Sequence, residues 1–432
     1  MSDITTVILA AGNSTRFKAN TSKLLYPLCG LPIISHVYNI AKKISGKKVI
    51  FVCNHKNKED IKSIFTNPNI IIQEKQKGTA HAIEKVRNKV KSKNILILFG
   101  DTPLIELSDI KKLINKFKSS KEKTSLIAFE TNKPYGYGRI FLKNNNVQEI
   151  IEEINLESNQ KNINLCNSGI LLINKKILFN NLKYIKEHKL KKEKYLPDIF
   201  KILSNKNIPT SYIRCKEDNM LGINTINDFI KAQNILQKKY INKFINKGVI
   251  FLKSESCYLS YDTKIETNVI IESNVTIKNN IIIKKGCIIK SNSYLEGAVI
   301  NDNCIIGPSA RIRPKSIIGK NSKIGNFVEI KNSKIGNNVA VSHLSYLGDS
   351  SLGNNINIGA GTITCNYDGQ KKQKTIIKDN VFVGSNSSLI APIIIEPNSI
   401  IGAGSVITKN IPKKSLAIER SDLKILRNKR VK

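Results

Sequence analysis

The sequence predicts a molecule of two parts, an α/β domain followed by a solenoid of parallel strands. Two observations lead to this fold class. Over roughly the first half of the 432 residues, apolar strand-like segments alternate with helical ones, which is typical of an α/β domain with a mostly parallel sheet. From Ile265 onward, an aliphatic residue returns at almost every sixth position, with single five-residue steps such as Leu295 to Ile300 and one inserted loop. We therefore expect an α/β domain over 1–224, a linker helix over 225–248 and a repeat domain over 249–432.

The α/β domain begins with an apolar segment at 4–9, which we interpret as a buried strand. Further strands are predicted at 48–53, 69–73, 94–99, 125–130 and 168–173. Helices are predicted between them, at 32–44, 79–91 and 108–118.

The linker is predicted as one long helix. Thr225 is a suitable N-cap residue, and Gly248 is a typical helix stop. Apolar side chains follow at helical spacing, namely Phe229, Ala232, Leu236 and Tyr240.

The repeat has a period of six, which fits neither a helix nor a plain strand. A short strand plus a turn fits it, so that three units close one triangular coil with the aliphatic side chain inside and Gly or Asn at the corners. Gly often follows the aliphatic residue, as at Gly319 and Gly336, and we expect tight corners there. By itself the period does not give the hand of the coil. It is also compatible with a purely structural solenoid or a trimerisation stalk.

The composition is strongly basic, with 70 Lys and Arg against 33 Asp and Glu and a net charge of +37. Such a charge is typical of nucleic-acid or membrane-surface binding. Lysine is spread along the whole chain rather than gathered in one stripe, so we expect neither nucleic acid nor membrane as a partner.

The cysteines and histidines indicate no metal or disulfide framework. The eight Cys contain no C-x-x-C pair and the five His are scattered, which favours a reducing, cytoplasmic location. The first residues lack a basic signal-peptide segment, and no apolar run approaches about 18 residues, so we expect no membrane span.

Two candidate ligand sites follow predicted strands, because ligands of α/β sheets bind outside the carboxyl ends of strands. The loop from Ala10 to Arg16, with Lys23 beyond it, has the small and basic residues that suit a polyphosphate. The strand 94–99 runs into Asp101. A lone Asp after a strand is usually a turn or cap residue. Beside a phosphate loop it favours Mg²⁺, which typically binds one or two carboxylates plus substrate phosphates.

These motifs resemble two known signatures. The segment Leu9–Gly12, with Thr15, Arg16, Lys23, Gln73, Gln76, Gly78–Thr79 and Gly100–Asp101, resembles that of the sugar nucleotidyltransferases. The six-residue repeat resembles the hexapeptide-repeat acyltransferases, whose coils wind left-handed. Together they resemble, over essentially the full chain, the bacterial family that joins an N-acetylglucosamine-1-phosphate uridyltransferase to a glucosamine-1-phosphate N-acetyltransferase. The resemblance implies a Rossmann-like α/β domain followed by a left-handed parallel β-helix.

In the first domain, the resemblance implies that UTP and the UDP-sugar are bound by Leu9, Ala10, Ala11, Gly12, Arg16, Lys23, Gln73, Gly78, Thr79, Phe99, Gly100, Asp101, Gly138, Glu152, Asn167 and Asn224. Of these, Gly138, Glu152 and Asn167 would contact the N-acetyl sugar, and Asp101 and Asn224 would bind Mg²⁺. Glu153 adjoins Glu152, and the pattern does not choose between them. Ser14 departs from the family's Gly-x-Gly-Thr-Arg loop.

In the second domain, the candidate catalytic residue is His343. A lone His in an aliphatic repeat is more often a surface or packing residue, but the segments around this one match the family's acetyltransferase site. The resemblance implies that the sugar phosphate and sugar are bound by Arg313, Lys331, Tyr346 and Asn357. It implies that acetyl-CoA is bound by Ala360, Asn366, Tyr367, Ser385, Ala403 and Arg420, with Asn366 and Tyr367 also beside the sugar. Beyond Arg420 the tail is shorter than the family's and has no Trp.

The expected function is two-step synthesis of UDP-N-acetylglucosamine by a homotrimer. His343 would accept the proton of the amine of glucosamine 1-phosphate as it attacks acetyl-CoA. The acetylated sugar phosphate would then attack UTP and release pyrophosphate, with Mg²⁺ assisting. One alternative is a glucose-1-phosphate nucleotidyltransferase with a non-catalytic β-helix. Another is a basic protein that binds nucleic acid or envelope polyanions.

Overall fold

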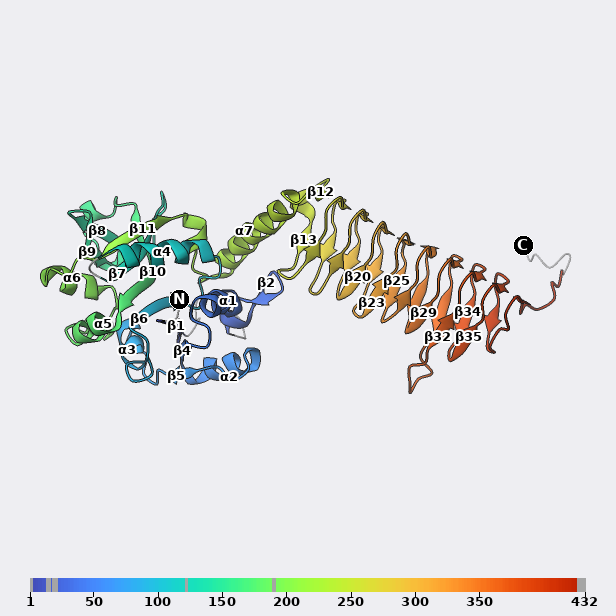
Figure 1. Cartoon of the computed structure of the whole chain (residues 1–432), viewed down its shortest axis with the longest axis horizontal. Helices are drawn as coiled ribbons and strands as arrows, with labels where there is room; N and C mark the ends of the chain where they lie inside the picture. Colours follow the sequence, from blue (N-terminus) through green and yellow to red (C-terminus); the bar gives the residue numbers. More distant parts are fainter. Residues whose placement is uncertain (1–2, 13–16, 18–21, 121–122, 189–191, 426–432) are drawn as a thin grey trace, which may run out of the picture. The chain divides into compact units, whose positions relative to one another are not determined.

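The computed structural model describes residues 3–12, 17, 22–120, 123–188 and 192–425. The chain divides into two compact units, 1–236 and 237–432, and each is described by itself (Figure 1). None of the described helices is both long and apolar enough to cross a bilayer.

The first unit is built on one sheet with the strand order β11-β7-β10-β6-β1-β4-β5. Its strands are β1 (Ile4–Ala10), β4 (Val49–Cys53), β5 (Ile70–Ile72), β6 (Asn94–Phe99), β7 (Thr124–Glu130), β10 (Leu165–Asn174) and β11 (Ser211–Cys215). All neighbours on this path are parallel except β10, which runs antiparallel to β6 and β7. The predicted mostly parallel sheet is therefore confirmed. A hairpin of β8 (Arg139–Lys143) and β9 (Asn146–Ile151), not predicted, attaches to β10 through β8.

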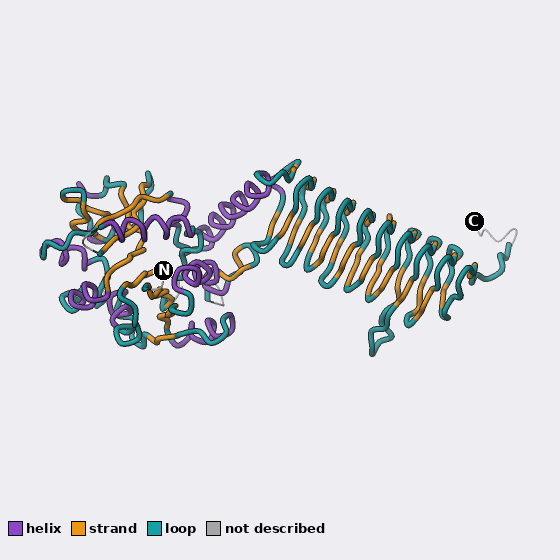
Figure 2. Tube along the Cα trace, in the orientation of Figure 1, coloured by secondary structure: helices purple, strands orange, loops and turns teal. Residues whose placement is uncertain are grey.

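Helices pack on both faces of this sheet (Figure 2). They are α1 (Ile33–Ser45), α2 (His55–Ile64), α3 (Thr79–Glu84), α4 (Leu107–Ser119), α5 (Lys175–Leu182) and α6 (Asp198–Asn205). Short elements connect them: η2 (Lys23–Leu25), β2 (Pro27–Leu28), β3 (Leu31–Pro32), η3 (Glu153–Asn155), η4 (Ser158–Gln160) and η5 (Glu217–Met220). Alternate side chains of β1 enter different cores, Val7 and Leu9 on one face and Ile4 and Ile8 on the other.

The helix predicted over 79–91 is wrong in its second half, because α3 ends at Glu84. Beyond it, Val86 N–H donates to Ile83 O and Arg87 N–H to Glu84 O. Such three-residue bonds make tight turns rather than an α-helix.

Helix α7 (Ile226–Ile245) confirms the predicted start at Thr225. The Thr225 Oγ1 accepts from the Asp228 N–H at 3.1 Å, and the Asp228 carboxylate accepts from the Thr225 N–H at 2.8 Å. This reciprocal pair is a capping box. Gly248 follows the helix with φ +83°, as its predicted role as a stop requires.

The second unit is a parallel β-helix in which three columns of short strands stack coil upon coil, after η6 (Ser254–Ser256) in its first coil (Figure 2). The first column comprises β12 (Ile250–Phe251), β15 (Ile270–Ile271), β18 (Ile288–Ile289), β21 (Ile305–Ile306), β24 (Lys323–Asn326), β27 (Ala340–His343), β30 (Asn357–Ile358), β33 (Phe382–Val383), β36 (Ile400–Ile401) and β38 (Leu416–Ala417). The second comprises β13 (Tyr258–Leu259), β16 (Thr276–Ile277), β19 (Tyr294–Leu295), β22 (Arg311–Ile312), β25 (Glu329–Lys331), β28 (Tyr346–Gly348), β31 (Ile363–Cys365), β34 (Ser388–Ile390) and β37 (Val406–Ile407). The third comprises β14 (Lys264–Ile265), β17 (Ile282–Ile283), β20 (Ala298–Ile300), β23 (Ser316–Ile318), β26 (Lys334–Ile335), β29 (Ser350–Leu352), β32 (Thr375–Ile377) and β35 (Ile393–Ile395).

The core of the β-helix confirms the six-residue interpretation. Ile271, Ile277, Ile283 and Ile289 are successive members of the series, and none is exposed to solvent. They belong to one apolar cluster that runs the length of the unit.

The corners differ from the prediction. The left-handed backbone conformation falls mainly on Asn three positions after the aliphatic residue, for example at Asn274 and Asn338. Gly319 and Gly336 do not adopt it. A Cβ on Gly319 would lie 2.2 Å from the carbonyl oxygen of Gly336, so glycine is needed there for the close approach of adjacent coils.

Candidate active sites

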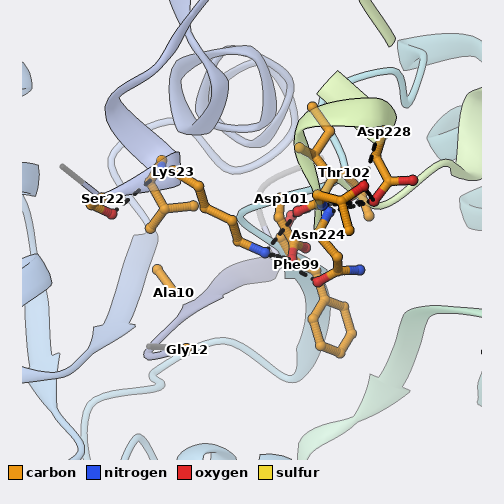
Figure 3. A network of polar contacts seen from close by, with 12 residues as sticks. Ala10, Gly12, Ser22, Lys23, Phe99, Asp101, Thr102, Asn224 and Asp228 are labelled. Carbon is orange, nitrogen blue, oxygen red and sulfur yellow. Dashed lines mark hydrogen bonds and ion pairs between the residues drawn. The ribbon is translucent and has the colours of Figure 1, made fainter. Parts of the chain in front are cut away.

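A buried lysine lies at the centre of the first candidate site. The Lys23 ammonium donates to Asp101 Oδ2 at 2.7 Å, to the Ile223 carbonyl at 2.7 Å and to Asn224 Oδ1 at 3.3 Å (Figure 3). Asp101 follows β6, and Asn224 precedes α7. The sheet and the start of α7 thus bring together three residues that are far apart in the sequence.

The three oxygens around Lys23 are hard donors, the type that Mg²⁺ prefers. In the described part of the chain, no group of three or more His, Cys, Asp or Glu is arranged to hold a metal ion. A divalent cation at Asp101 would therefore need further oxygen ligands, and substrate phosphates supply such ligands. The residues present fit Mg²⁺ on that condition.

A cavity of about 370 Å³ adjoins this cluster. It is lined by most of the residues predicted to bind UTP: Leu9, Ala10, Ala11, Gly12, Lys23, Gln73, Gly78, Thr79, Phe99, Asp101 and Asn224. Gly100 lies against the first strand instead, where its N–H donates to the Leu9 carbonyl at 2.9 Å. Arg16, Thr15 and Ser14 lie outside the described residues.

Side-chain amides fix the loop after β1. The Asn57 amide donates to the Ala10 carbonyl at 2.7 Å and the Gly12 carbonyl at 3.2 Å. Asn54 and Gln76 both donate to the Ala11 carbonyl. Sequence reasoning missed Asn54 and Asn57. Asn54 could have been found from the sequence, because it directly follows the strand β4 and is a typical N-cap residue for α2.

A second cavity, of about 330 Å³, shares Thr79, Phe99, Asp101 and Asn224 with the first. Its lining includes the three residues predicted for the N-acetyl sugar: Gly138, Glu152 and Asn167. The first unit therefore has two adjoining cavities with a carboxylate and an amide at their meeting point.

The neighbouring glutamates Glu152 and Glu153 have different surroundings. Glu152 lines the second cavity. Glu153 instead accepts from the buried Arg139 guanidinium at 2.8 Å and from the Gly136 N–H at 3.0 Å. Glu152 thus lies in the wall of the cavity, and Glu153 holds the loop that carries Gly138.

The second candidate site lies on the β-helix around His343. Its Nδ1 is 2.6 Å from Asn326 Oδ1, the residue paired with it on the preceding coil. The amide oxygen faces the ring, so in the neutral ring Nδ1 carries the proton and Nε2 keeps a free lone pair. His343 is exposed at the corner between the first and second strand columns, so this nitrogen is accessible.

Basic and polar side chains gather on the adjacent second column. Arg313 donates to Glu329 at 2.7 Å, and Lys331 and Tyr346 lie on the next two coils. Lys372, which sequence reasoning missed, lies beside Lys331 and holds the pKa of Lys331 below its ordinary value. The Asp349 carboxylate opposes this shift. Two neighbouring ammonium groups favour an anionic ligand.

The remaining predicted residues lie on nearby coils. Asn357 is on β30, and the buried Asn366 donates to Asp349 at 2.5 Å, while Tyr367 is exposed. Ala360 and Ser385 carry carbonyls that accept from Asn386 and Gly404 on the next coil. Ala403 lies beside Gly384 of the preceding coil, and Arg420 lies beside Gly402.

Comparisons with known proteins match both parts of the chain. Residues 6–163 match the family of MobA-like NTP transferase domains, and residues 297–332 and 374–409 match the bacterial transferase hexapeptide repeats. The bifunctional protein GlmU of Bartonella bacilliformis is 39% identical over 432 residues, covering 99% of this chain and 96% of the relative. GlmU of Thermodesulfovibrio yellowstonii is 39% identical, with 97% of each chain covered. GlmU of Buchnera aphidicola from Acyrthosiphon pisum is 40% identical, with 99% and 97% covered.

The fold and the two sites define a bifunctional transferase, with a nucleotidyltransferase domain preceding a left-handed parallel β-helix of the hexapeptide acyltransferase type. The chain belongs to the GlmU family of bifunctional enzymes.

Proposed function

We propose that the chain makes UDP-N-acetylglucosamine in two steps, acetylating glucosamine 1-phosphate on the β-helix and transferring a uridylyl group in the α/β unit. The observation that carries the second step is the Lys23, Asp101 and Asn224 cluster, which lies where the two cavities of the α/β unit meet. A nucleotide in the first cavity and a sugar phosphate in the second would meet at this cluster.

In the uridylyl step, the residues of the first cavity bind and orient UTP, and Gly138, Glu152 and Asn167 orient the sugar. The sugar phosphate oxygen attacks the α-phosphorus, the bond to the β-phosphate oxygen breaks, and pyrophosphate leaves. Lys23 turns from its oxygen partners to a phosphate and neutralises its charge. Such a transfer depends on positioning and charge stabilisation more than on covalent chemistry by the protein.

Asp101 and Asn224 would hold Mg²⁺, which supplies Lewis-acid polarisation and charge neutralisation at the phosphates. Their oxygens already surround one cation, the Lys23 ammonium.

In the acetyl step, Arg313, Lys331 and Lys372 bind the sugar phosphate, while Tyr346 and Asn357 orient the sugar. The free Nε2 of His343 takes the proton of the amine as its nitrogen attacks the thioester carbon of acetyl-CoA. Coenzyme A then leaves as the thiol. Asn326 acts as the positioning residue, because its oxygen fixes the ring tautomer.

The working form in this proposal is a homotrimer in the cytoplasm. His343 is exposed on one β-helix, so neighbouring subunits would complete an enclosed acetyl site. Eight free cysteines suit a reducing compartment.

The test supplies acetyl-CoA, glucosamine 1-phosphate, UTP and Mg²⁺, and identifies the products by mass. We expect His343→Ala to lower acetyl transfer by about 10²- to 10⁴-fold and to leave uridylyl transfer from ready-made N-acetylglucosamine 1-phosphate unchanged. We expect Asp101→Asn to do the reverse, reducing uridylyl transfer by about 10²-fold or more.

Each variant is the control for the other, because the two sites lie in different compact units. Loss of both activities in either variant would indicate misfolding. A parent protein that transfers a nucleotide but consumes no acetyl-CoA would favour the glucose-1-phosphate nucleotidyltransferase alternative and contradict the proposal.

A further inference from the structure

The buried side chain of Gln73 lies in the wall of the nucleotide cavity, and its amide orientation is determined by its partners. One amide atom is 3.0 Å from the Gly78 carbonyl oxygen. A carbonyl oxygen can only accept, so this atom must be the nitrogen, Nε2. The orientation therefore follows from chemistry and needs no further assumption.

The second hydrogen of that Nε2 is directed to His81, whose Nδ1 lies 3.1 Å away. Because the amide nitrogen is a donor, Nδ1 must be the unprotonated nitrogen of a neutral imidazole. Both hydrogens of Nε2 are then used by the protein. Within the described part of the chain, no hydrogen bond involves the Gln73 Oε1, so this acceptor is left for a ligand in the cavity.

Charged groups around His81 favour the neutral ring. His81 borders a separate hollow of about 300 Å³, which is lined otherwise by Glu74, Lys75, Lys77, Lys85, Glu187 and Lys194. Burial, followed by the positive charge of Lys85, lowers the pKa of His81 below 6.5, and Glu84 opposes the effect. Lys77 and Lys194 also lower it. At neutral pH the acceptor on Nδ1 is available.

We propose that His81 is a positioning residue for base selection, which holds Gln73 with Oε1 toward the nucleotide and so favours uracil over cytosine. The inference rests on the proposed role of the first cavity in binding UTP. Uracil carries an N3–H donor that Oε1 can accept, whereas cytosine has an acceptor at N3 and would face Oε1 without a hydrogen bond.

Protonation of His81 would remove this preference. A protonated Nδ1 becomes a donor and faces a donor on Gln73, so the amide loses one of its two fixed partners. As the pH falls below 6.5, the discrimination against cytosine should therefore decrease.

The test measures UDP and CDP affinity by titration calorimetry on the full-length protein and its variants. The parent protein should bind UDP more tightly than CDP at pH 8. His81→Leu removes the acceptor and should reduce this preference about five- to tenfold, the effect of one lost hydrogen bond. His81→Asn places Oδ1 near the position of Nδ1, so it should retain the preference and make it independent of pH.

Lys85, which directly follows α3 and lies four residues after His81, offers a matched control. Lys85→Gln removes a positive charge near His81 without touching Gln73, so it should leave the preference at pH 8 unchanged and move its loss to higher pH. A purely structural role for His81 would not predict this shift.

Three results would overturn the inference: a parental preference in His81→Leu, an equal loss in His81→Leu and His81→Asn, or no change in the pH profile of Lys85→Gln. A parent protein that does not bind UDP would overturn the proposed function as well. The two failures are thus distinguishable.

Discussion

Arg139 is among the most buried large side chains of the chain, and its charge is compensated by Glu153 at 2.8 Å. Glu153 is about one-third exposed, with 35% of its side chain accessible, so solvent screens part of this interaction. Removing it would leave a buried guanidinium without its carboxylate. Glu152 instead lines the second cavity.

We predict that Glu153→Gln lowers the free energy of unfolding by about 1–3 kcal/mol, below the full cost of breaking a buried pair because Glu153 is partly exposed. Glu152→Gln should leave stability nearly unchanged and raise the KM for N-acetylglucosamine 1-phosphate. Denaturant titration and steady-state kinetics on both variants provide the measurement. A loss of stability in Glu152→Gln together with a raised KM in Glu153→Gln would contradict these assignments.

Asparagines form a ladder along one edge of the β-helix. Each side-chain amide donates to the asparagine of the next coil, in the order Asn303, Asn321, Asn338, Asn355 and Asn380, and Asn398 accepts the last of these bonds. Each also adopts a positive φ, +55° at Asn338. Asparagine suits this position twice, since it tolerates the left-handed backbone and its amide can both donate and accept.

We predict that Asn338→Ala destabilises the β-helix by about 1–2 kcal/mol through backbone strain and two lost hydrogen bonds. Asn338→Gly removes the same bonds but accepts the backbone angle, so its loss should be smaller. Thermal unfolding of both variants separates the cost of backbone strain from the cost of the lost hydrogen bonds. Equal losses would show that φ contributes little.

The sequence was informative where local pattern decides the structure. The strand at 94–99 and the six-residue period were predictable, because apolar runs and spacing encode burial directly. The hairpin β8–β9 was missed because only residues at its two ends, Gly138 and Glu152, were considered from the sequence. The role of Gly319 could not be predicted either, since it depends on the adjacent coil rather than on its own φ.

In the candidate sites too, residues within local motifs were predictable, and residues that depend on spatial neighbours were not. The loop residues near Lys23 and the residues around His343 were found from motifs, whereas Lys372 and Asn57 were not. Their relevance comes from a spatial neighbour that no local pattern encodes. Neighbouring surroundings likewise distinguish Glu152 from Glu153, which adjacency in sequence could not do.

Over the β-helix as a whole, apolar side chains also face outward. Phe382, Ile400 and Leu416 are register partners on successive coils of the first column, and all three are exposed. A continuous exposed apolar row typically marks an interaction surface. It supports the proposal that β-helices associate.

We predict a mass of three chains for the parent protein by light scattering, and dissociation on Ile400→Asp, which would bury a charge in the apolar contact. The rate of acetyl transfer should decrease as the trimer dissociates, whereas the rate of uridylyl transfer should not change. A monomeric protein that still acetylates at the parental rate would contradict this.

The stacking of coils has a consequence for how the chain can change in length. Equivalent asparagines on adjacent coils are 18 residues apart at Asn274 and Asn292, 17 at Asn321 and Asn338, and 25 where the loop with Tyr367 is inserted. Extra residues are therefore accommodated at a corner, while a single residue added within a strand would turn inward-facing side chains to the solvent. Duplication or loss of a whole coil would keep every column in register. Inherited variation in the length of this unit should thus occur in steps of about one coil or as corner loops.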